Sequence, residues 1–292
     1  MMRIDQPKWV LHYKFPDYMS SMTQQPPLTD THTLHLHHRN RRTSDGMFLQ
    51  QEAFDEIAER LLGVKKSFTK TAVVTSWPDL WATIVEGADV IHPDDTLLFT
   101  DNGYDLIVHA MDLHWANDPV GQIVQCRNAL KPDGLFLAAC FGGQTLNELR
   151  SAIAEAESRV MDGLSPRVVP MGEVRDYGAL LQRAGLALPV ADTLTLPVSY
   201  SDTTALIIDL RKMGESNALT ARTKKPTPKS VFDALETIYR QNFSEGKRLI
   251  ATFEIIFLAG WVPDASQQKP LKPGSAKMKL ADALRIPNDP KD

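Results

Sequence analysis

The fold of this chain is decided by residues 104–143, which read YDLIVHAMDLHWANDPVGQIVQCRNALKPDGLFLAACFGG. Residues 106–111 form an almost unbroken apolar run, as expected of a strand that is buried on both faces of a parallel sheet. Asp118 and Pro119 then begin a helix, because Asp supplies a side-chain acceptor and Pro presets φ at the first helical position. Residues 135–141 form a second buried strand. Strand, crossover helix and strand make one right-handed βαβ unit, so the sequence predicts an α/β fold.

The composition is that of an ordinary globular protein, with 292 residues, 43% hydrophobic and 23% charged. The net charge of −4 gives no reason to expect nucleic acid or an anionic membrane as a partner. Two cysteines, Cys126 and Cys140, provide no disulfide framework and favour a reducing compartment. Because neither an apolar run of about 20 residues nor an import signal is found, we expect a cytoplasmic protein without an integral membrane segment. Any membrane contact would then be made through a partner.

We divide the chain into three parts. Residues 1–33 are polar and without periodicity, and are predicted to be a disordered or loosely docked segment. Residues 34–262 form the α/β domain, with a first half at 34–143 and a second half at 144–262. Residues 263–292 are rich in proline and read as an extended tail.

The central unit resembles a known superfamily. A strand, a Leu-His-Trp-x-Asn-Asp loop, a helix and Leu-Lys-Pro-Asp-Gly before a second strand resemble the fourth and fifth strands of class I S-adenosylmethionine (SAM) dependent methyltransferases. The segments LHWANDP, RDYGALLQRAGLALPVADTL and ATFEIIFLAGWVP are closer to one branch. That branch contains the mitochondrial complex I assembly factor, an arginine hydroxylase, and its bacterial relatives. The carrier-protein methyltransferase of biotin synthesis is a more distant relative.

This resemblance implies a Rossmann-like sheet that is mostly parallel, with an antiparallel last strand at residues 249–258. The first half of the domain is predicted to be shortened. Only 28 residues, 76–103, separate the expected first strand at 71–75 from the central unit, and they hold a helix at 80–85 and a short strand at 97–99. Since a βαβ unit takes about 30 residues, roughly one strand–helix unit is missing.

The resemblance fails at the loop where the superfamily binds its cofactor. There, glycines that follow the first strand let the backbone approach the nucleotide, and the next helix points its N-terminus at it. In this chain Ser76, Trp77, Pro78 and Asp79 follow the strand instead. Trp77 would occupy volume that the cofactor needs, and Pro78 removes a donor. SAM is the cofactor that the resemblance implies, and this loop predicts that it binds weakly.

Asp112, His114, Trp115 and Asn117 follow the central strand, where ligands of open α/β sheets lie. His114 and Asp112 are the catalytic candidates, because histidine serves in acid–base chemistry near neutral pH and a carboxylate can orient a polar group. Trp115 and Asn117 are candidates for binding the cofactor, and the resemblance implies that Asp94 faces its adenine. The structural alternatives are that Trp115 packs under the next helix, Asn117 caps it, and Asp94 lies in a solvated turn.

Four further residues are candidates for contact with a substrate or partner. Gly142 and Gly143 follow the second strand, where they either let the backbone approach a ligand or turn the corner. Glu215 and Asn217 lie in a segment that resembles the family's Gly-x-x-Asn loop, which the resemblance implies closes over the substrate. Thr145 and Glu148 have the spacing of a helix capping box.

His32, His35, His37 and His38 form a cluster, but no cysteine or acidic residue stands near it in the sequence. A solvated surface therefore explains the cluster better than a metal site, and no metal is expected.

Two functions remain in view. The first is a SAM-dependent enzyme that methylates or hydroxylates a protein side chain in respiratory complex I assembly. The alternative is a non-catalytic scaffold of the same fold that acts in that assembly without holding SAM tightly. In either case the partner is a protein. The sequence contains no G-x-S-x-G, C-x-x-C, H-E-x-x-H or P-loop motif that would indicate other chemistry.

Overall fold

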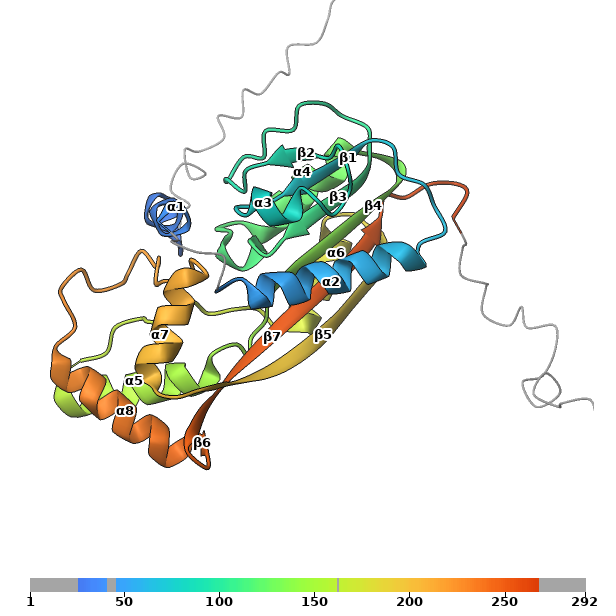
Figure 1. Ribbon diagram of the computed structural model, residues 1–292. Coiled ribbons are helices and arrows are strands. Elements are labelled where there is room, and N and C mark those ends of the chain that lie inside the picture. The colour runs from blue at the N-terminus through green and yellow to red at the C-terminus, as the bar shows by residue number, and fades with distance from the viewer. Residues whose placement is uncertain (1–25, 41–45, 162, 268–292) are drawn as a thin grey trace, which may run out of the picture.

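The computed structural model describes residues 26–40, 46–161 and 163–267 (Figure 1). Its helices are α1 (Thr31–Arg39), α2 (Phe48–Gly63), α3 (Pro78–Trp81), the 3₁₀ turn η3 (Leu113–Trp115), α4 (Pro119–Ala129), α5 (Asn147–Val160), α6 (Val174–Arg183), α7 (Thr203–Lys212) and α8 (Lys229–Asn242). Its strands are β1 (Thr71–Val74), β2 (Asp89–Ile91), β3 (Tyr104–Ala110), β4 (Leu130–Phe141), β5 (Ala187–Tyr200), β6 (Ser244–Glu245) and β7 (Arg248–Trp261).

The seven strands of the described residues belong to one sheet, in the order β2-β1-β3-β4-β7-β5, with β6 paired to β7. The strands β2, β1, β3 and β4 run parallel to one another. The last strand, β7, runs antiparallel to both β4 and β5. The expected α/β fold, a mostly parallel sheet with an antiparallel last strand, is confirmed.

The central βαβ unit forms as its sequence predicts. Every residue of β3 is buried, and the Asp118 side chain accepts a hydrogen bond of 2.8 Å from the Gly121 N–H to cap α4. The polar residue within β3 is accommodated by a partner, because His109 Nε2 lies 2.8 Å from Gln122 Oε1 on α4. Burial lowers the pKa of His109, so this ring is neutral in the core.

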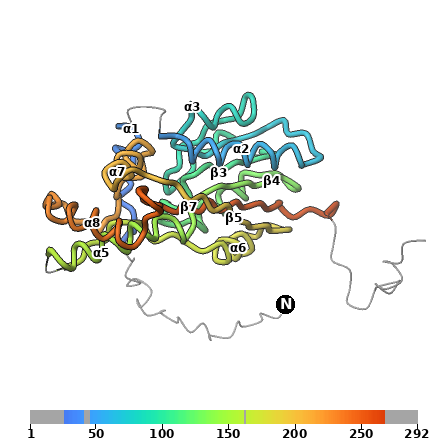
Figure 2. The backbone as a smooth tube through the Cα atoms, turned by 60° about the horizontal axis from the view of Figure 1, so that its bottom comes forward, coloured from blue at the N-terminus to red at the C-terminus, as the bar shows by residue number. Residues whose placement is uncertain are grey.

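Helices cover both faces of the sheet (Figure 2). On one face α2 packs Leu49, Ala53 and Ile57 against the strands. On the other face, α4 and α6 pack side chains that include Ile123 and Leu181. Cys126 of α4 and Cys140 of β4 belong to this second layer, and both are buried free thiols. Burial raises the pKa of the Cys140 thiol to about 12.

The strands β5 and β7 are each 14 residues long. A second group of helices, α5, α7 and α8, lies near the C-terminal end of β5 and the N-terminal end of β7 (Figure 1). The apolar faces of these helices join the core on the α2 side of the sheet. Within the described ranges, none of the helices combines the length and apolar character required to span a membrane.

Two expected elements between β1 and β3 differ in the structure. The helix expected at 80–85 is the four-residue α3, which begins at Pro78. The strand expected at 97–99 is a loop, because the Leu97 N–H donates to the Gln125 side chain rather than to a neighbouring strand. The edge strand is β2, which pairs with β1. The stretch between β1 and β3 thus contains one four-residue helix, α3, and one three-residue strand, β2. That the first half of the domain is shortened relative to the superfamily stays a prediction.

The expected boundary at residue 33 falls inside a helix. Thr29 pairs with Leu219, and the Asp30 side chain caps α1, so the chain is packed onto the domain before residue 34. The remaining residues of the predicted N-terminal segment, 1–25, and residues 268–292 of the predicted tail lie outside the described part.

Asp105 fixes the start of β1 against β3. Its carboxylate accepts hydrogen bonds from the N–H groups of Thr69 and Lys70 at 2.9 and 3.0 Å, and Lys131 Nζ lies 3.2 Å away. Burial acts to raise the pKa of Asp105, but the hydrogen bonds outweigh it and the pKa is lowered. The carboxylate therefore stabilises the fold above the unfolded-state pKa of about 3.9, and this contribution is lost as the pH falls through the lower folded-state pKa.

We predict that Asp105→Asn lowers the free energy of unfolding at pH 7 by about 2 kcal/mol, because charged acceptors make the stronger hydrogen bonds. The difference from the unsubstituted protein should narrow below about pH 4. Urea unfolding between pH 7 and pH 3 measures both effects. Asp55→Asn on the exposed face of α2 is the control, and a loss for Asp105→Asn that is constant with pH would contradict the assignment.

Candidate functional site

Glu215 accepts hydrogen bonds from two side chains that follow the central strand. Trp115 Nε1 donates to its Oε2 at 2.8 Å, and His114 Nε2 lies 3.3 Å from the same oxygen. The other ring nitrogen of His114, Nδ1, accepts from the N–H of Phe141 at 3.4 Å. Since a backbone N–H can only donate, Nε2 carries the ring proton and donates to Glu215. The sequence-predicted residues His114, Trp115 and Glu215 are therefore brought together.

The second oxygen of Glu215 is buried and has no hydrogen-bond partner in the described part of the chain. Its side chain is only 6% exposed, and Oε1 accepts no hydrogen bond within the described residues. A buried carboxylate oxygen without a partner is costly, so such an atom marks a place where a donor from outside can bind.

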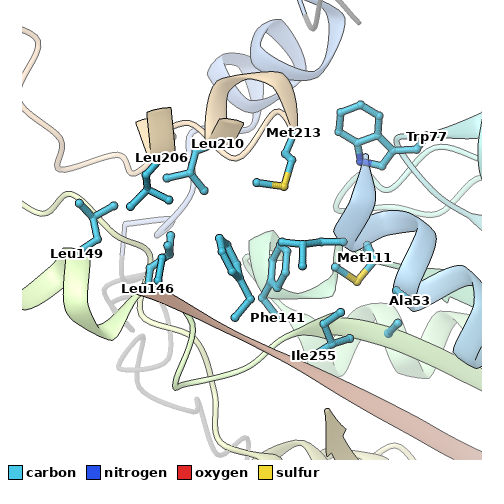
Figure 3. Packing of buried hydrophobic residues seen from close by; sticks show 14 of the residues in the cluster. Ala53, Trp77, Met111, Phe141, Leu146, Leu149, Leu206, Leu210, Met213 and Ile255 are labelled. Carbon is cyan, nitrogen blue, oxygen red and sulfur yellow. The ribbon is translucent and has the colours of Figure 1, made fainter. Parts of the chain in front are cut away.

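Glu215 borders a cavity of about 260 Å³ between the sheet and α5, α7 and α8. The walls are mostly apolar and aromatic, and the lining residues include Trp115, Phe141, Leu146, Leu149, Ile153, Val169, Leu210, Phe232, Leu235 and Phe253. Phe141, Leu146, Leu149 and Leu210 are labelled in Figure 3. The polar lining residues are Thr145, Arg167, Arg211, Glu215, Ser216, Asn217 and Thr227, among which Glu215 is the acid. A mostly apolar cavity with a few fixed polar groups is typical of ligand sites.

The charge of Arg167 at this cavity is compensated. Its Nε donates to Glu157 Oε1 at 2.7 Å, and the Glu157 side chain is 1% exposed. Burial acts to raise the pKa of Glu157, whereas hydrogen bonds from Ser165 and Arg167 lower it, with a net lowering. Arg211 is exposed to solvent. Glu215 is therefore the acidic lining group that is held inside the protein.

Both carboxylate oxygens of Asp112 bind the loop that follows β1. They accept from the N–H and the hydroxyl of Ser76 at 2.8 and 2.7 Å. The catalytic role expected for Asp112 stays a prediction, and its contacts are with this loop.

The Ser76 loop places Trp77 in the core. The indole is 1% exposed, and its ring centroid lies 5.3 Å from that of His38 on α1. It belongs to the same buried cluster as Met111 and Met213 (Figure 3). Gly214 faces it with φ +78°, and a Cβ at that position would lie 3.0 Å from the indole and 2.7 Å from His38. The volume at the carboxyl end of β1 is thus filled by protein side chains.

The two asparagine candidates bind backbone. Asn117 accepts from the Thr29 N–H at 2.8 Å and donates to the Thr29 carbonyl at 3.2 Å, so it docks the chain before α1. With His114 it also borders a second hollow of about 230 Å³. Asn217 donates to the Pro166 carbonyl at 2.8 Å and accepts from the Leu219 N–H at 3.0 Å, beside the first cavity.

Neighbouring side chains leave no space for a Cβ at Gly142 and Gly143, the two glycines after β4. A Cβ on Gly142 would lie 2.4 Å from Glu254 Oε2, and one on Gly143 would lie 2.6 Å from Glu173 Oε1. Close packing therefore explains these glycines, and neither borders the cavity that Glu215 lines.

Asp94 lies in an exposed turn after β2, where its carboxylate faces His35 and His92.

Sequence reasoning found the polar part of this site but missed its walls. The side chains of α5 that line the cavity, such as Leu149 and Ile153, repeat with helical spacing, which is also the pattern of a helix face that packs in the core. The position of Phe232 of α8 at the cavity could not be predicted from the sequence, because residues that line a cavity and residues that pack in the core show the same local pattern.

The sequence is similar to proteins named "Arginine-hydroxylase NDUFAF5, mitochondrial". The Dictyostelium discoideum protein is 40% identical over 179 residues, covering 61% of this chain and 41% of the relative. The human protein is 36% identical over 207 residues, covering 70% of this chain and 60% of the relative. The chain is a homologue of NDUFAF5. It spans between 41% and 61% of the length of the first three such relatives.

More distant relatives of the chain are named malonyl-[acyl-carrier protein] O-methyltransferase. The protein of Laribacter hongkongensis is 29% identical over 180 residues, covering 62% of this chain and 58% of the relative. A solved SAM-dependent methyltransferase of *Thermotoga maritima* is 12% identical with a TM-score of 0.41, covering 79% of this chain and 99% of that one. No protein-family model matches the chain. The resemblance stated from the sequence, to the branch of the arginine-hydroxylase assembly factor and more distantly to the carrier-protein methyltransferase, is confirmed.

Alanine substitutions at two glycines, Gly214 and Gly87, test how closely the core packs around Trp77. Gly214 and Gly87 have nearly the same φ, +78° and +77°, but a Cβ on Gly87 would meet nothing within 4 Å. We predict that Gly87→Ala lowers the free energy of unfolding by about 1 kcal/mol, because alanine disfavours a left-handed backbone. Gly214→Ala should cost about 2–3 kcal/mol more, because its Cβ also overpacks the core. Urea unfolding of the two variants compares them, and equal losses would show that Trp77 and His38 are not packed against Gly214.

Proposed function

We propose that this chain is a class I methyltransferase-superfamily protein that binds a basic side chain of a partner protein in respiratory complex I assembly, without holding SAM tightly. The observation that carries the proposal is the buried Glu215 carboxylate, whose Oε1 is without a donor among the described residues at a cavity with aromatic walls. The similarity to NDUFAF5 supports a role in complex I assembly. The relatives are named arginine hydroxylases, which agrees with a cationic side chain as the ligand.

A basic side chain matches both features of the cavity. Its N–H groups can donate to Oε1, while His114 and Trp115 hold the other oxygen in place. Its aliphatic stem and its charge can lie against the aromatic rings of the wall, which attract cations by their quadrupoles. A neutral side chain of the same shape would leave the carboxylate without a charged partner.

The end of β1 argues against tight SAM binding. The Ser76–Asp79 turn has no glycine, and Trp77 with its neighbours fills the space that a nucleotide would need. Asp112 is bonded to Ser76 and so stabilises this closed arrangement. We therefore prefer the hypothesis of a non-catalytic scaffold to that of an enzyme. The cytoplasmic location predicted from the sequence is kept as part of this proposal.

The second candidate function is a SAM-dependent enzyme that methylates or hydroxylates the bound side chain. The names of the relatives favour it, since they include an arginine hydroxylase and a methyltransferase. If the enzyme reading holds, His114 and Asp112 are the catalytic candidates, Asp94, Trp115 and Asn117 the cofactor-binding ones, and Gly142, Gly143, Glu215 and Asn217 those for substrate.

Calorimetric titration of the purified full chain with SAM separates the two candidates. We expect no heat of binding up to about 1 mM SAM, because Trp77 occupies the site at the end of β1. Thermal unfolding of the same sample verifies that the protein is folded. A dissociation constant in the micromolar range would overturn the scaffold function in favour of the enzyme.

The cavity is tested with a minimal ligand pair, N-acetyl-arginine amide and its neutral isostere N-acetyl-citrulline amide. We expect the arginine compound to bind at least tenfold more tightly, because one charge-assisted hydrogen bond is worth about 1.5–3 kcal/mol. Glu215→Gln should abolish this preference while it keeps an acceptor for His114 and Trp115. The matched control is Glu245→Gln on the exposed strand β6. Equal binding of both ligands, or an unchanged preference in Glu215→Gln, would contradict the proposal.

A further inference from the structure

A second group of polar side chains gathers on the surface beside α1. His35 on α1 and His92 and Asp94 after β2 each offer one ligand atom, and these atoms all lie within 4.8 Å of one another. His35 Nε2 is 3.2 Å from Asp94 Oδ1, and His92 Nδ1 is 3.4 Å from Asp94 Oδ2. The two imidazole rings meet edge to face with centroids 4.6 Å apart.

The sequence-based expectation of no metal depended on the lack of an acidic residue near the histidine cluster. The fold removes that reason, because it brings the turn after β2 against α1. Of the four histidines in the sequence cluster, His35 alone belongs to the group that could hold an ion in the described part of the chain. His37 and His38 are turned toward the interior, where burial lowers the pKa of each.

We infer that His35, His92 and Asp94 bind one divalent late first-row transition-metal ion, of which Zn²⁺ is the representative. Two imidazole nitrogens and one carboxylate oxygen suit these ions, whereas Mg²⁺ and Ca²⁺ prefer oxygen ligands. Ligand atoms about 2.1 Å from a tetrahedral zinc ion lie roughly 3.4 Å apart. The three candidate ligand atoms lie within 4.8 Å of one another, so the half-exposed side chains need to close by about 1.4 Å at most to reach that spacing. Three protein ligands leave a fourth position for water.

The backbone around each ligand is fixed. The carbonyl of Asp94 accepts from Gln122 Nε2 at 2.9 Å, and its N–H donates to the His92 carbonyl at 3.0 Å. On the other side, α1 is held at its start by Asp30, whose side chain also pairs with Arg222 at 3.0 Å. Ligands that are placed by anchored segments lose little freedom on binding an ion, which favours affinity.

The ion would fasten α1 to the edge of the sheet. The helix is anchored at its N-terminal end through Asp30, and a metal at His35 would add a second attachment one turn further on. Because binding to the folded state alone stabilises it, metal should also protect α1 from local opening. This inference does not depend on the proposed function of the Glu215 cavity.

The test is calorimetric titration of the metal-free full chain with ZnCl₂, with CoCl₂ as a spectroscopic probe of coordination. We expect one ion per chain, and His92→Ala and Asp94→Asn should each weaken binding at least tenfold. His32→Ala is the matched control, since His32 is an exposed histidine of the same helix outside the cluster. Amide exchange of residues 31–39 should slow with Zn²⁺ in the unsubstituted protein and in His32→Ala.

Two results would overturn the inference. One is zinc affinity that is equal in His92→Ala, Asp94→Asn and His32→Ala, since it would mean that only adventitious surface binding occurs. The other is the absence of zinc binding at 100-fold molar excess over the chain. The three substituted residues are exposed, so the variants should stay folded and their zinc affinities can be compared directly.

Discussion

The hydrogen bonds that Glu215 accepts from His114 and Trp115 join the segment after α7 to the end of β3, across about 100 residues of sequence. This contact fixes several neighbours at once. Gly214, directly before Glu215, adopts positive φ and leaves space for Trp77. Ala218, shortly after it, accepts from the N–H of Asp30 and so holds the start of α1. The cavity, the packed indole and the docking of α1 therefore share one anchor.

The carboxyl ends of the parallel strands serve different purposes. At β1, Asp112 binds Ser76 and the loop places Trp77 in the core, so this end contributes packing. At β4, Phe141 borders the cavity and its N–H fixes the His114 ring. A buried indole contributes several kcal/mol of apolar burial, which explains how a chain without the glycine loop keeps a stable corner at β1.

Local patterns predicted the central unit because its signals are short-range: an apolar run, Asp118 before Pro119, and a second apolar run. The strand β2 was missed, since it has three residues, of which only Ile91 is buried, and so short a segment shows no periodicity. The capping box at Thr145 and Glu148 is absent, because Thr145 Oγ1 donates to the Glu254 carbonyl and Glu148 accepts from Thr252. Of the site, His114 and Trp115 followed from strand position, whereas Glu215 came from the resemblance alone. No local rule could pair it with residues 100 positions away.

The two thiols of the second core layer offer an internal reporter of that layer. Cys126 and Cys140 are fully buried between the sheet and the helices α4 and α6, and burial raises the pKa of both. Thiolate is the species that alkylating reagents attack, so the folded protein should resist them near neutral pH. Each modification event would therefore require the layer to separate, and the rate of alkylation would count those separations without any introduced label.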